Sequence, residues 1–349
     1  MRIVVTGATG NAGTSVLNAL AGDPHVSEIV GIARRLPRLS APRTTWLQAD
    51  VVTAPLTELF RGADAVIHLA WLIQPSRDER ALETVNVTGS RRVFEAAAAA
   101  GVSALVHASS IGAYSPGPGD RAVDESWPTE GTPTSFYARH KAAAERALDA
   151  VEAANPRLRV VRLRPALIFK REAASGIRRL FAGPLLPSPL VRPALLPVLP
   201  LPAGLRVQAV HGADVGEAYR LAATEERARG AYNVAADPVL DAATLGRALG
   251  ARPVRVPVGA VRAAADLTWR LRLQPTPPGW LDMGMAVPLM DAGRIRRELG
   301  WAPRHAADDA LLELMAGLRD CAGAPTPPLE PRAGGPLRVR EFLAGVGRT

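Results

Sequence analysis

The chain has 349 residues, of which 48% are hydrophobic and 21% charged, the composition of a globular protein of one or two domains. The net charge is +9, but only two of the 42 basic residues are lysines and the arginines are scattered, which argues against binding to nucleic acid. The single cysteine, Cys321, excludes an internal disulfide, and no apolar run is long enough for a signal peptide or a membrane span, so we expect a cytoplasmic protein.

The first 165 residues alternate short β-rich runs with longer helical stretches. Strands are predicted at Arg2–Thr6, Glu28–Ala33, Thr44–Gln48, Asp64–Leu69, Leu105–Ala108 and Leu158–Leu163, and helices at Asn11–Leu20, Leu56–Arg61, Asp78–Ala100 and Ser135–Ala154. This alternation predicts an α/β fold of the Rossmann type, a doubly wound parallel sheet with helices on both faces.

The pattern changes after Pro165. Residues Gly183–Gly204 are too rich in proline for a regular helix and read as an extended connection. Val207–His211 and a helix at Asp214–Thr224 are expected to return to the main sheet. The chain is therefore divided into a dinucleotide-binding domain (1–165, with 206–224 returning to it), a smaller C-terminal substrate-binding lobe (166–205 and 225–321) and a Pro/Gly-rich tail (322–349).

Three glycines follow the first predicted strand, at Gly7, Gly10 and Gly13. The first permits a tight turn, the second lets backbone approach a pyrophosphate, and the third lets the following helix pack closely. The backbone N–H groups of Asn11 and Ala12 then open a helix whose N-terminus attracts an anion. In this strand–turn–helix context the glycines predict a nicotinamide-dinucleotide site.

The end of the second predicted strand distinguishes between cofactors. An NAD site uses an acidic residue there for the ribose 2′-hydroxyl, whereas this chain has Arg34 and Arg35. Two guanidinium groups suit a 2′-phosphate, so we expect NADP, with NAD as the alternative. Asp50 and Val51 follow the third strand and are expected to contact the adenine.

Tyr137 and Lys141 lie four residues apart on a predicted helix and hence on one face. An ammonium beside a tyrosine favours the phenolate and lowers its pKa, which suits acid–base catalysis. Lys141 is also one of only two lysines, the other being Lys170. Ser110 ends the fifth strand, at the edge where ligands bind, and is expected to hydrogen-bond a substrate carbonyl.

Apolar side chains surround the expected pocket. Trp71, Leu72 and Ile73 follow the fourth strand, and the substrate is expected to contact Trp71, Ser110, Ile111 and Phe136. His68 is interpreted as structural or cofactor-lining. The six histidines are scattered and no paired metal-ligand motif occurs, so we expect no metal site.

Taken together, these motifs resemble the extended short-chain dehydrogenase/reductase family, also called NAD-dependent epimerase/dehydratases. Those that carry the resemblance are Gly7-x-x-Gly10-x-x-Gly13, Asp50-Val51, His68-Leu69-Ala70, Asn86-Val87-x-Gly89, Ser110 with Tyr137 and Lys141, Arg164-Pro165, Val210-His211-x-x-Asp214-Val215, Tyr232-Asn233-Val234 and Leu299-Gly300-Trp301-x-Pro303. The resemblance implies a catalytic triad of Ser110, Tyr137 and Lys141. It also implies cofactor contacts from Leu69, Ala70, Asn86, Lys141 and Pro165, and a homodimer.

Three functions remain open. The first is an NADP-dependent oxidoreductase acting on a carbonyl or secondary alcohol of a small, apolar molecule, which the arginines and the apolar pocket favour. The second is an NAD-dependent nucleotide-sugar epimerase, as in many members of the resembled family. The third is a non-catalytic NADP-sensing regulatory protein, against which Tyr137 and Lys141 argue, because sensors of this type tend to lose the pair.

Overall fold

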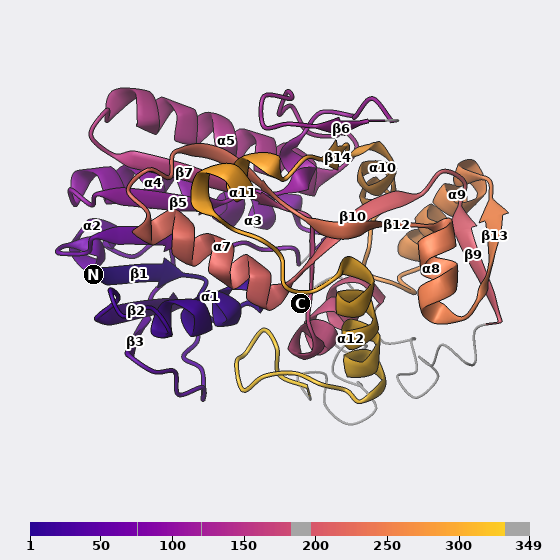
Figure 1. Cartoon of the computed structure of the whole chain (residues 1–349), viewed down its shortest axis with the longest axis horizontal. Helices are drawn as coiled ribbons and strands as arrows, with labels where there is room; N and C mark the ends of the chain where they lie inside the picture. The colour runs from indigo at the N-terminus through magenta and orange to yellow at the C-terminus, as the bar shows by residue number, and fades with distance from the viewer. Residues whose placement is uncertain (75, 120, 183–196, 332–349) are drawn as a thin grey trace.

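A computed structural model describes residues 1–74, 76–119, 121–182 and 197–331 of the chain. Its main sheet has seven strands, and every neighbouring pair is parallel. From one edge to the other the strands are β3 (Thr44–Gln48), β2 (Glu28–Ala33), β1 (Arg2–Thr6), β4 (Ala65–His68), β5 (Ala104–Ala108), β7 (Arg159–Pro165) and β11 (Gly230–Val234). The carboxyl ends of these strands face the smaller lobe (Figure 1).

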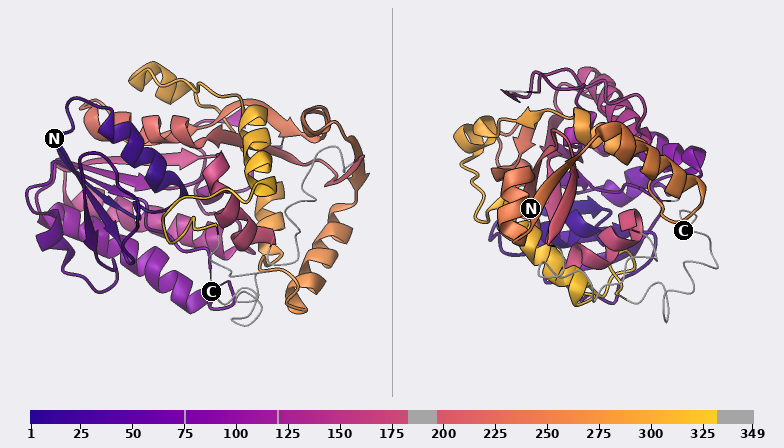
Figure 2. Two further views of the ribbon diagram at one scale, coloured as in Figure 1. Left: turned by 90° about the horizontal axis from the view of Figure 1, so that it is seen from below. Right: turned by 90° about the vertical axis from the view of Figure 1, so that its right-hand side faces the viewer.

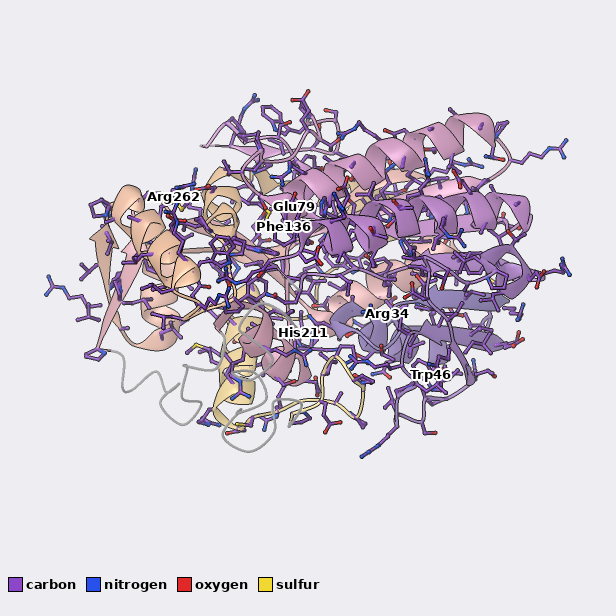
Figure 3. The ribbon with its side chains drawn as sticks, turned by 180° about the vertical axis from the view of Figure 1, so that it is seen from behind. Arg34, Trp46, Glu79, Phe136, His211 and Arg262 are labelled. Atoms are coloured by element: carbon purple, nitrogen blue, oxygen red, sulfur yellow. The ribbon has the colours of Figure 1, made fainter. Side chains whose placement is uncertain are left out.

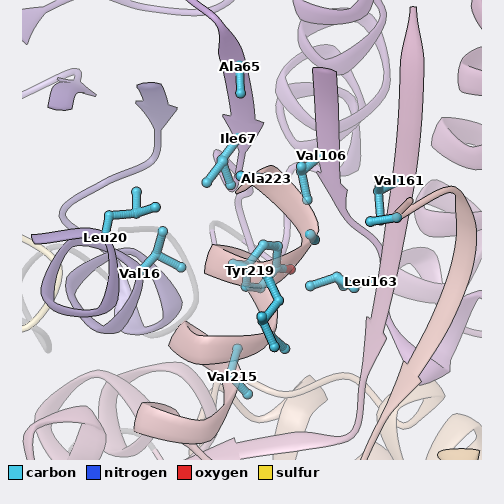
Figure 4. Packing of buried hydrophobic residues seen from close by; sticks show 14 of the residues in the cluster. Val16, Leu20, Ala65, Ile67, Val106, Val161, Leu163, Val215, Tyr219 and Ala223 are labelled. Atoms are coloured by element: carbon cyan, nitrogen blue, oxygen red, sulfur yellow. The ribbon is translucent and has the colours of Figure 1, made fainter. Parts of the chain in front are cut away.

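Helices cover both faces of this sheet. α1 (Asn11–Ala21) and α7 (Gly212–Thr224) lie side by side on one face (Figure 2), and α2 (Leu56–Phe60), α4 (Ser90–Ala99) and α5 (Phe136–Ala154) cover the other. Alternate residues of β1 therefore enter different cores: Ile3 and Val5 pack with α1 and α7, and Val4 packs on the opposite side. Figure 4 shows Tyr219 of α7 in the core that contains Ile3 and Val5. Burying each such aliphatic side chain contributes roughly 1.5–3 kcal/mol. The predicted fold class is confirmed.

The stretch predicted as one helix over Asp78–Ala100 is divided. It consists of α3 (Glu79–Glu83), a π-helical segment (Thr84–Gly89) and α4. At Gly89 a Cβ would lie 3.0 Å from Cγ2 of Val51, so the segment packs closely against the strand-end loop. A π-helical segment inserts an extra residue into a turn, and such segments recur at functional sites.

The smaller lobe is built on short sheets. β8 (Leu167–Phe169), β10 (Arg206–His211) and β12 (Ala236–Asp241) form one, β9 (Val198–Pro202) pairs with β13 (Arg252–Val256), and β6 (Ala122–Val123) pairs with β14 (Leu289–Met290). The remaining described helices are α6 (Ala174–Ile177), α8 (Ala242–Leu249), α9 (Val258–Arg270), α10 (Gly279–Ala286), α11 (Gly293–Leu299) and α12 (Ala307–Arg319). Single 3₁₀ turns occur at Ile111–Ala113 and Arg171–Ala173, and a second π-helical segment at Arg178–Ala182.

Two elements differ from the expected division. The strand expected at Val207–His211 joins the three-stranded sheet rather than the main one, because Val207 and Ala209 pack with apolar residues of β12 and α12. The helix after it does return to the main sheet as α7. β11, expected in the second lobe, is instead the edge strand of the main sheet beside β7.

The proline-rich segments are only partly described. Of the predicted extended connection at Gly183–Gly204, residues 183–196 lie outside the described residues, and β9 follows them. In the tail, residues 322–331 pack against the smaller lobe: Leu329 is buried, its carbonyl accepts a hydrogen bond from Oγ of Ser175 at 2.8 Å, and Arg179 donates to the carbonyl of Pro328 at 2.6 Å. Residues 332–349 are outside the described part. None of the described helices combines the length and apolarity needed to cross a bilayer.

Candidate active site

The glycine-rich loop connects β1 to α1. Gly7 has φ +70°, and a Cβ there would lie 2.6 Å from the backbone nitrogen of Ala70. A Cβ at Gly13 would lie 2.5 Å from the carbonyl oxygen of Gly7, so this glycine packs against the loop itself. At Gly10 the nearest atom to a Cβ is 3.4 Å away. The first and third glycines are therefore required by packing, whereas the second leaves the loop open to an approaching ligand.

The N-terminus of α1 has the features of an anion site. No side chain caps it, and the first N–H groups of a helix have no partner within the helix. These unpaired backbone N–H groups and the open face at Gly10 fit the diphosphate of a dinucleotide.

A hollow of about 530 Å³ lies at the ends of β2 and β3, lined by Arg34, Gln48, Ala49, Asp50, Thr53, Ala54, Pro55 and Leu59. Arg34 and Arg35 are both exposed, and no ion pair joins either of them to another described residue. Figure 3 shows Arg34 and Trp46 on the dinucleotide side of the molecule, at the other end from Arg262. One carboxylate oxygen of Asp50 accepts the N–H of Val52 at 2.8 Å. This hollow has the position and the charge expected for the adenosine end of a dinucleotide.

Ser110, Tyr137 and Lys141 come together beyond the carboxyl end of β5. Ser110 caps the turn at Ile111–Ala113 and hydrogen-bonds to the hydroxyl of Tyr137. Ser135 caps α5, which presents Tyr137 and Lys141 one turn apart. Burial raises the pKa of Tyr137, and the hydrogen bond from Ser110 offsets part of that rise.

Lys141 is buried beside the tyrosine. Its ammonium donates to the carbonyl of Ala108 at 2.6 Å and lies 3.5 Å from the ring centre of Trp71. Burial lowers the pKa of Lys141 to about 7, against the opposing charge of Glu145. The sequence predicted a lowered pKa for Tyr137. In the structure the shift is upward, because burial outweighs the hydrogen bond from Ser110. The ammonium of Lys141 lies 5.7 Å from the phenol ring centre.

A buried ion pair lies next to the group of Ser110, Tyr137 and Lys141. Arg164 of β7 donates to both carboxylate oxygens of Glu145 on α5, at 2.8 and 2.5 Å. Glu145 also accepts from the hydroxyl of Ser109, and Arg164 donates to the hydroxyl of Tyr114 at 3.0 Å. The network fixes the turn that carries Ser110 relative to α5. Sequence reasoning did not identify Glu145, although its position one turn beyond Lys141 was a usable signal.

Aromatic side chains gather on the tyrosine. The ring centroid of Trp280 on α10 lies 4.8 Å from that of Tyr137. The ring of Phe181 is edge-on to that of Trp280, with 4.9 Å between the centroids. Trp71 lies edge-on to Tyr137 at 5.9 Å. Phe136 is largely buried and lies 6.1 Å from Trp280. Trp280 and Phe181 come from segments far from Tyr137 in sequence, and no local motif marks them.

Other predicted contacts serve to hold the site in place. The amide of Asn86 donates to the carbonyl of Leu72 at 2.8 Å and accepts its N–H at 2.7 Å, which clamps the segment that contains Leu69 and Ala70. His68 lies between hydroxyls of Thr6 and Ser90, at 2.7 and 2.9 Å, and burial lowers its pKa to about 3. His68 is thus structural, as one of its two interpretations had it.

Two further predicted contact residues are buried. Ile111 packs in a small core with Tyr114 and Met290. Pro165 is buried at the end of β7.

The sequence indicated no metal-ligand cluster, but the fold brings together His211, Asp214 and His305, whose ligand atoms lie within 4.8 Å of one another. Protein groups already engage them. Nδ1 of His211 accepts the N–H of Ala213 at 3.2 Å, and Asp214 lies 3.0 Å from Nδ1 of His305. Since His211 thereby caps α7, this cluster is accounted for by helix capping.

Comparisons with known proteins agree with this geometry. The chain is 35% identical over 158 residues to a UDP-glucose 4-epimerase of Mycolicibacterium smegmatis, covering 42% of this chain and 49% of that protein. It is 28% identical over 325 residues, 93% of its length, to an uncharacterised protein of Mycobacterium tuberculosis. The chain spans only 31% of that longer relative.

Solved structures share the fold. UDP-glucose 4-epimerase of Thermus thermophilus in complex with NAD superposes with a TM-score of 0.66 and 21% identity, covering 91% of this chain and 99% of that one. The dTDP-glucose 4,6-dehydratase of Streptomyces venezuelae, with NAD bound, gives a TM-score of 0.66 at 21% identity, with 92% and 97% covered.

The model of the NAD dependent epimerase/dehydratase family matches residues 3–235. This range contains the glycine loop, the hollow at the ends of β2 and β3, and the group of Ser110, Tyr137 and Lys141. The chain belongs to the NAD dependent epimerase/dehydratase family.

Proposed function

We propose that this protein is an NADP-dependent oxidoreductase that reduces the carbonyl of an apolar small molecule, or oxidises the corresponding secondary alcohol. The observation that carries the proposal is the surroundings of Tyr137. Its hydroxyl is hydrogen-bonded to that of Ser110, and the buried Lys141 lies one turn along α5. Its ring packs against the rings of Trp71 and Trp280. Polar catalytic atoms and an apolar wall thus meet at one point.

The residues would act as follows. The bound nicotinamide supplies or accepts the hydride. Ser110 and Tyr137 both donate hydrogen bonds toward a substrate oxygen, and Tyr137 gives its proton to the oxygen as negative charge develops. A tyrosine is protonated at neutral pH, and burial raises the pKa of Tyr137 further, so that its hydroxyl can act as the proton donor in carbonyl reduction. Lys141 holds positive charge beside the phenol and binds cofactor hydroxyls.

The cofactor preference is tested by removing Arg34 and Arg35. The double substitution Arg34→Ala/Arg35→Ala should raise the KM for NADPH about 10- to 100-fold, because charge-assisted hydrogen bonds to a 2′-phosphate are lost. The KM for NADH should stay within about twofold. Arg61→Ala is the matched control, since this exposed arginine accepts a hydrogen bond through its carbonyl from Arg2, which begins β1 at the opposite end from the proposed cofactor site. Equal losses for both cofactors would contradict the assignment.

The apolar substrate is tested at Trp280. Trp280→Ala should lower kcat/KM for aromatic ketones about tenfold, because an aromatic pair and its buried area are removed, and should change the affinity for NADPH little. Leu271→Ala, an exposed change at the end of α9, should have no effect. A variant that handled aromatic ketones as well as the wild type would exclude Trp280 from the substrate site.

A nucleotide-sugar epimerase is the second candidate, and the comparisons favour it. The Mycolicibacterium smegmatis relative and the Thermus thermophilus structure are both UDP-glucose 4-epimerases. An epimerase returns the hydride to the same substrate, so NAD would stay bound and not be consumed. Conversion of UDP-glucose to its epimer, with no net oxidation or reduction of the nicotinamide, would favour the epimerase over the oxidoreductase.

A further inference from the structure

The second of the two lysines, Lys170, has a position that the proposed catalytic group does not explain. It follows β8 in the smaller lobe and is only 7% exposed. Apart from Lys141 and Lys170, all of the 42 lysine and arginine positions are arginine. A buried lysine is costly unless its ammonium has partners and a reason to be charged.

All three protons of the ammonium are directed at the first turns of α1. Nζ of Lys170 donates to the carbonyl of Asn11 at 2.8 Å, to Oγ1 of Thr14 at 2.7 Å and to Oγ of Ser15 at 2.8 Å. The stem reaches this point through a gap left by Gly212 of α7, where a Cβ would lie 2.8 Å from Cδ of Lys170. The amide of Asn11 in turn donates to the carbonyl of Ile168 at 3.1 Å. The smaller lobe is thus attached to the turn that opens α1.

On its own, this position is electrostatically unfavourable for an ammonium. The N-terminus of a helix carries partial positive charge, which repels a cation. Around the ammonium, α1 contributes no charged group, and His211 stands at the start of α7. Glu172 and Glu313 oppose the burial that lowers the pKa of Lys170 to about 8. An anion bound in front of α1 would reverse the balance, because it attracts both the helix end and the ammonium behind it.

We propose that Lys170 is a positioning residue for the cofactor diphosphate: its ammonium holds the first turn of α1 and adds a full positive charge behind the anion-binding N–H groups. Its own protons are used by the protein, so it acts on the diphosphate through charge and through α1. The inference rests on the proposed function only in requiring that the chain binds a nicotinamide dinucleotide.

The test compares the full-length wild type, Lys170→Met and Lys170→Arg by equilibrium binding, with cofactor fluorescence as the signal. At neutral pH, Lys170→Met should weaken the binding of NADPH and of NADH to the same extent, about 10- to 30-fold. Lys170→Arg should restore most of the affinity. At saturating cofactor, kcat should be nearly unchanged. Affinity for 2′-AMP, which lacks the diphosphate, should be the same in all three proteins.

The pH profile separates charge from packing. In the wild type, affinity should be constant below a pH of about 8 and should fall above it, because the free protein then loses the ammonium. This fall should be absent in Lys170→Met, which is always neutral, and in Lys170→Arg, which stays charged. Lys141 is present in all three proteins, so its own titration cancels in the comparison.

Three results would overturn the inference. Lys170→Met could bind dinucleotides as tightly as the wild type, or its affinities for 2′-AMP and NADPH could fall by the same factor. Its affinity could also depend on pH in the same way as that of the wild type. A wild type that prefers NADH contradicts only the proposed cofactor preference, and the affinities of the three proteins are then compared with NADH. A wild type that binds neither dinucleotide contradicts the inference and the proposed function together.

Discussion

Replacing Tyr137 with phenylalanine should reduce kcat by roughly 10³-fold or more, since a positioned acid–base group contributes about 10²–10⁴-fold. The change removes one hydroxyl and leaves the ring between Trp71 and Trp280. The affinity for NADPH should change by less than about twofold, because the hydroxyl is assigned to the substrate oxygen. Steady-state turnover and cofactor binding measured on the same preparation check both statements.

The matched control for this variant is Tyr232→Phe. Tyr232 lies on the edge strand β11 and hydrogen-bonds to Glu298 at 2.7 Å, so its loss should leave kcat unchanged. If Tyr137→Phe retained most of the wild-type turnover, another group would have to carry the proton. If it lost NADPH binding as well, the tyrosine would have a role in the cofactor site that the proposed mechanism does not include.

Replacing Glu145 with leucine should give the largest loss of stability among the substitutions considered. It leaves the guanidinium of Arg164 buried without a counter-charge, which costs roughly 3–5 kcal/mol in comparable proteins. Burial alone would raise the pKa of Glu145, but the hydrogen bonds and charge of Arg164 outweigh it and hold the pKa below its usual value. The stabilisation is therefore present above the ordinary glutamate range and is lost as the pH falls below it.

Urea unfolding at neutral pH measures the loss directly. Glu95→Leu is the control: Glu95 forms an exposed pair with Arg91 at 3.8 Å on α4, and such pairs contribute at most about 0.5 kcal/mol. A loss below about 1 kcal/mol for Glu145→Leu would mean that the buried pair does not hold the site together.

Local patterns were sufficient for most of the main sheet. The strand predicted at Arg2–Thr6 has the observed bounds, because an apolar β-branched run that ends at a glycine turn leaves few alternatives. The strand at Val207–His211 was also present, but its sheet was predicted wrongly. Which neighbours a strand takes depends on contacts distant in sequence, here with β8 and β12, and a local pattern does not contain them.

The candidate site divides in the same way. Ser110, Tyr137 and Lys141 were predictable because two lie on one helix face and the third ends a strand whose edge must bind ligand. Trp280 was not, because it reaches Tyr137 only through the packing of α10 on α5. The rarity of lysine marks Lys170 in the sequence, but its partners on α1 are more than 150 residues away and no local pattern indicates them.

The most direct test of the proposed activity is a single experiment with purified protein, NADPH and a panel of aromatic and aliphatic ketones, with UDP-glucose alongside. The near-ultraviolet absorbance of the reduced nicotinamide is followed in wild type and Tyr137→Phe. We expect the absorbance to fall with an apolar ketone in the wild type only. A constant absorbance with every ketone, while UDP-glucose is converted to its epimer, would contradict it.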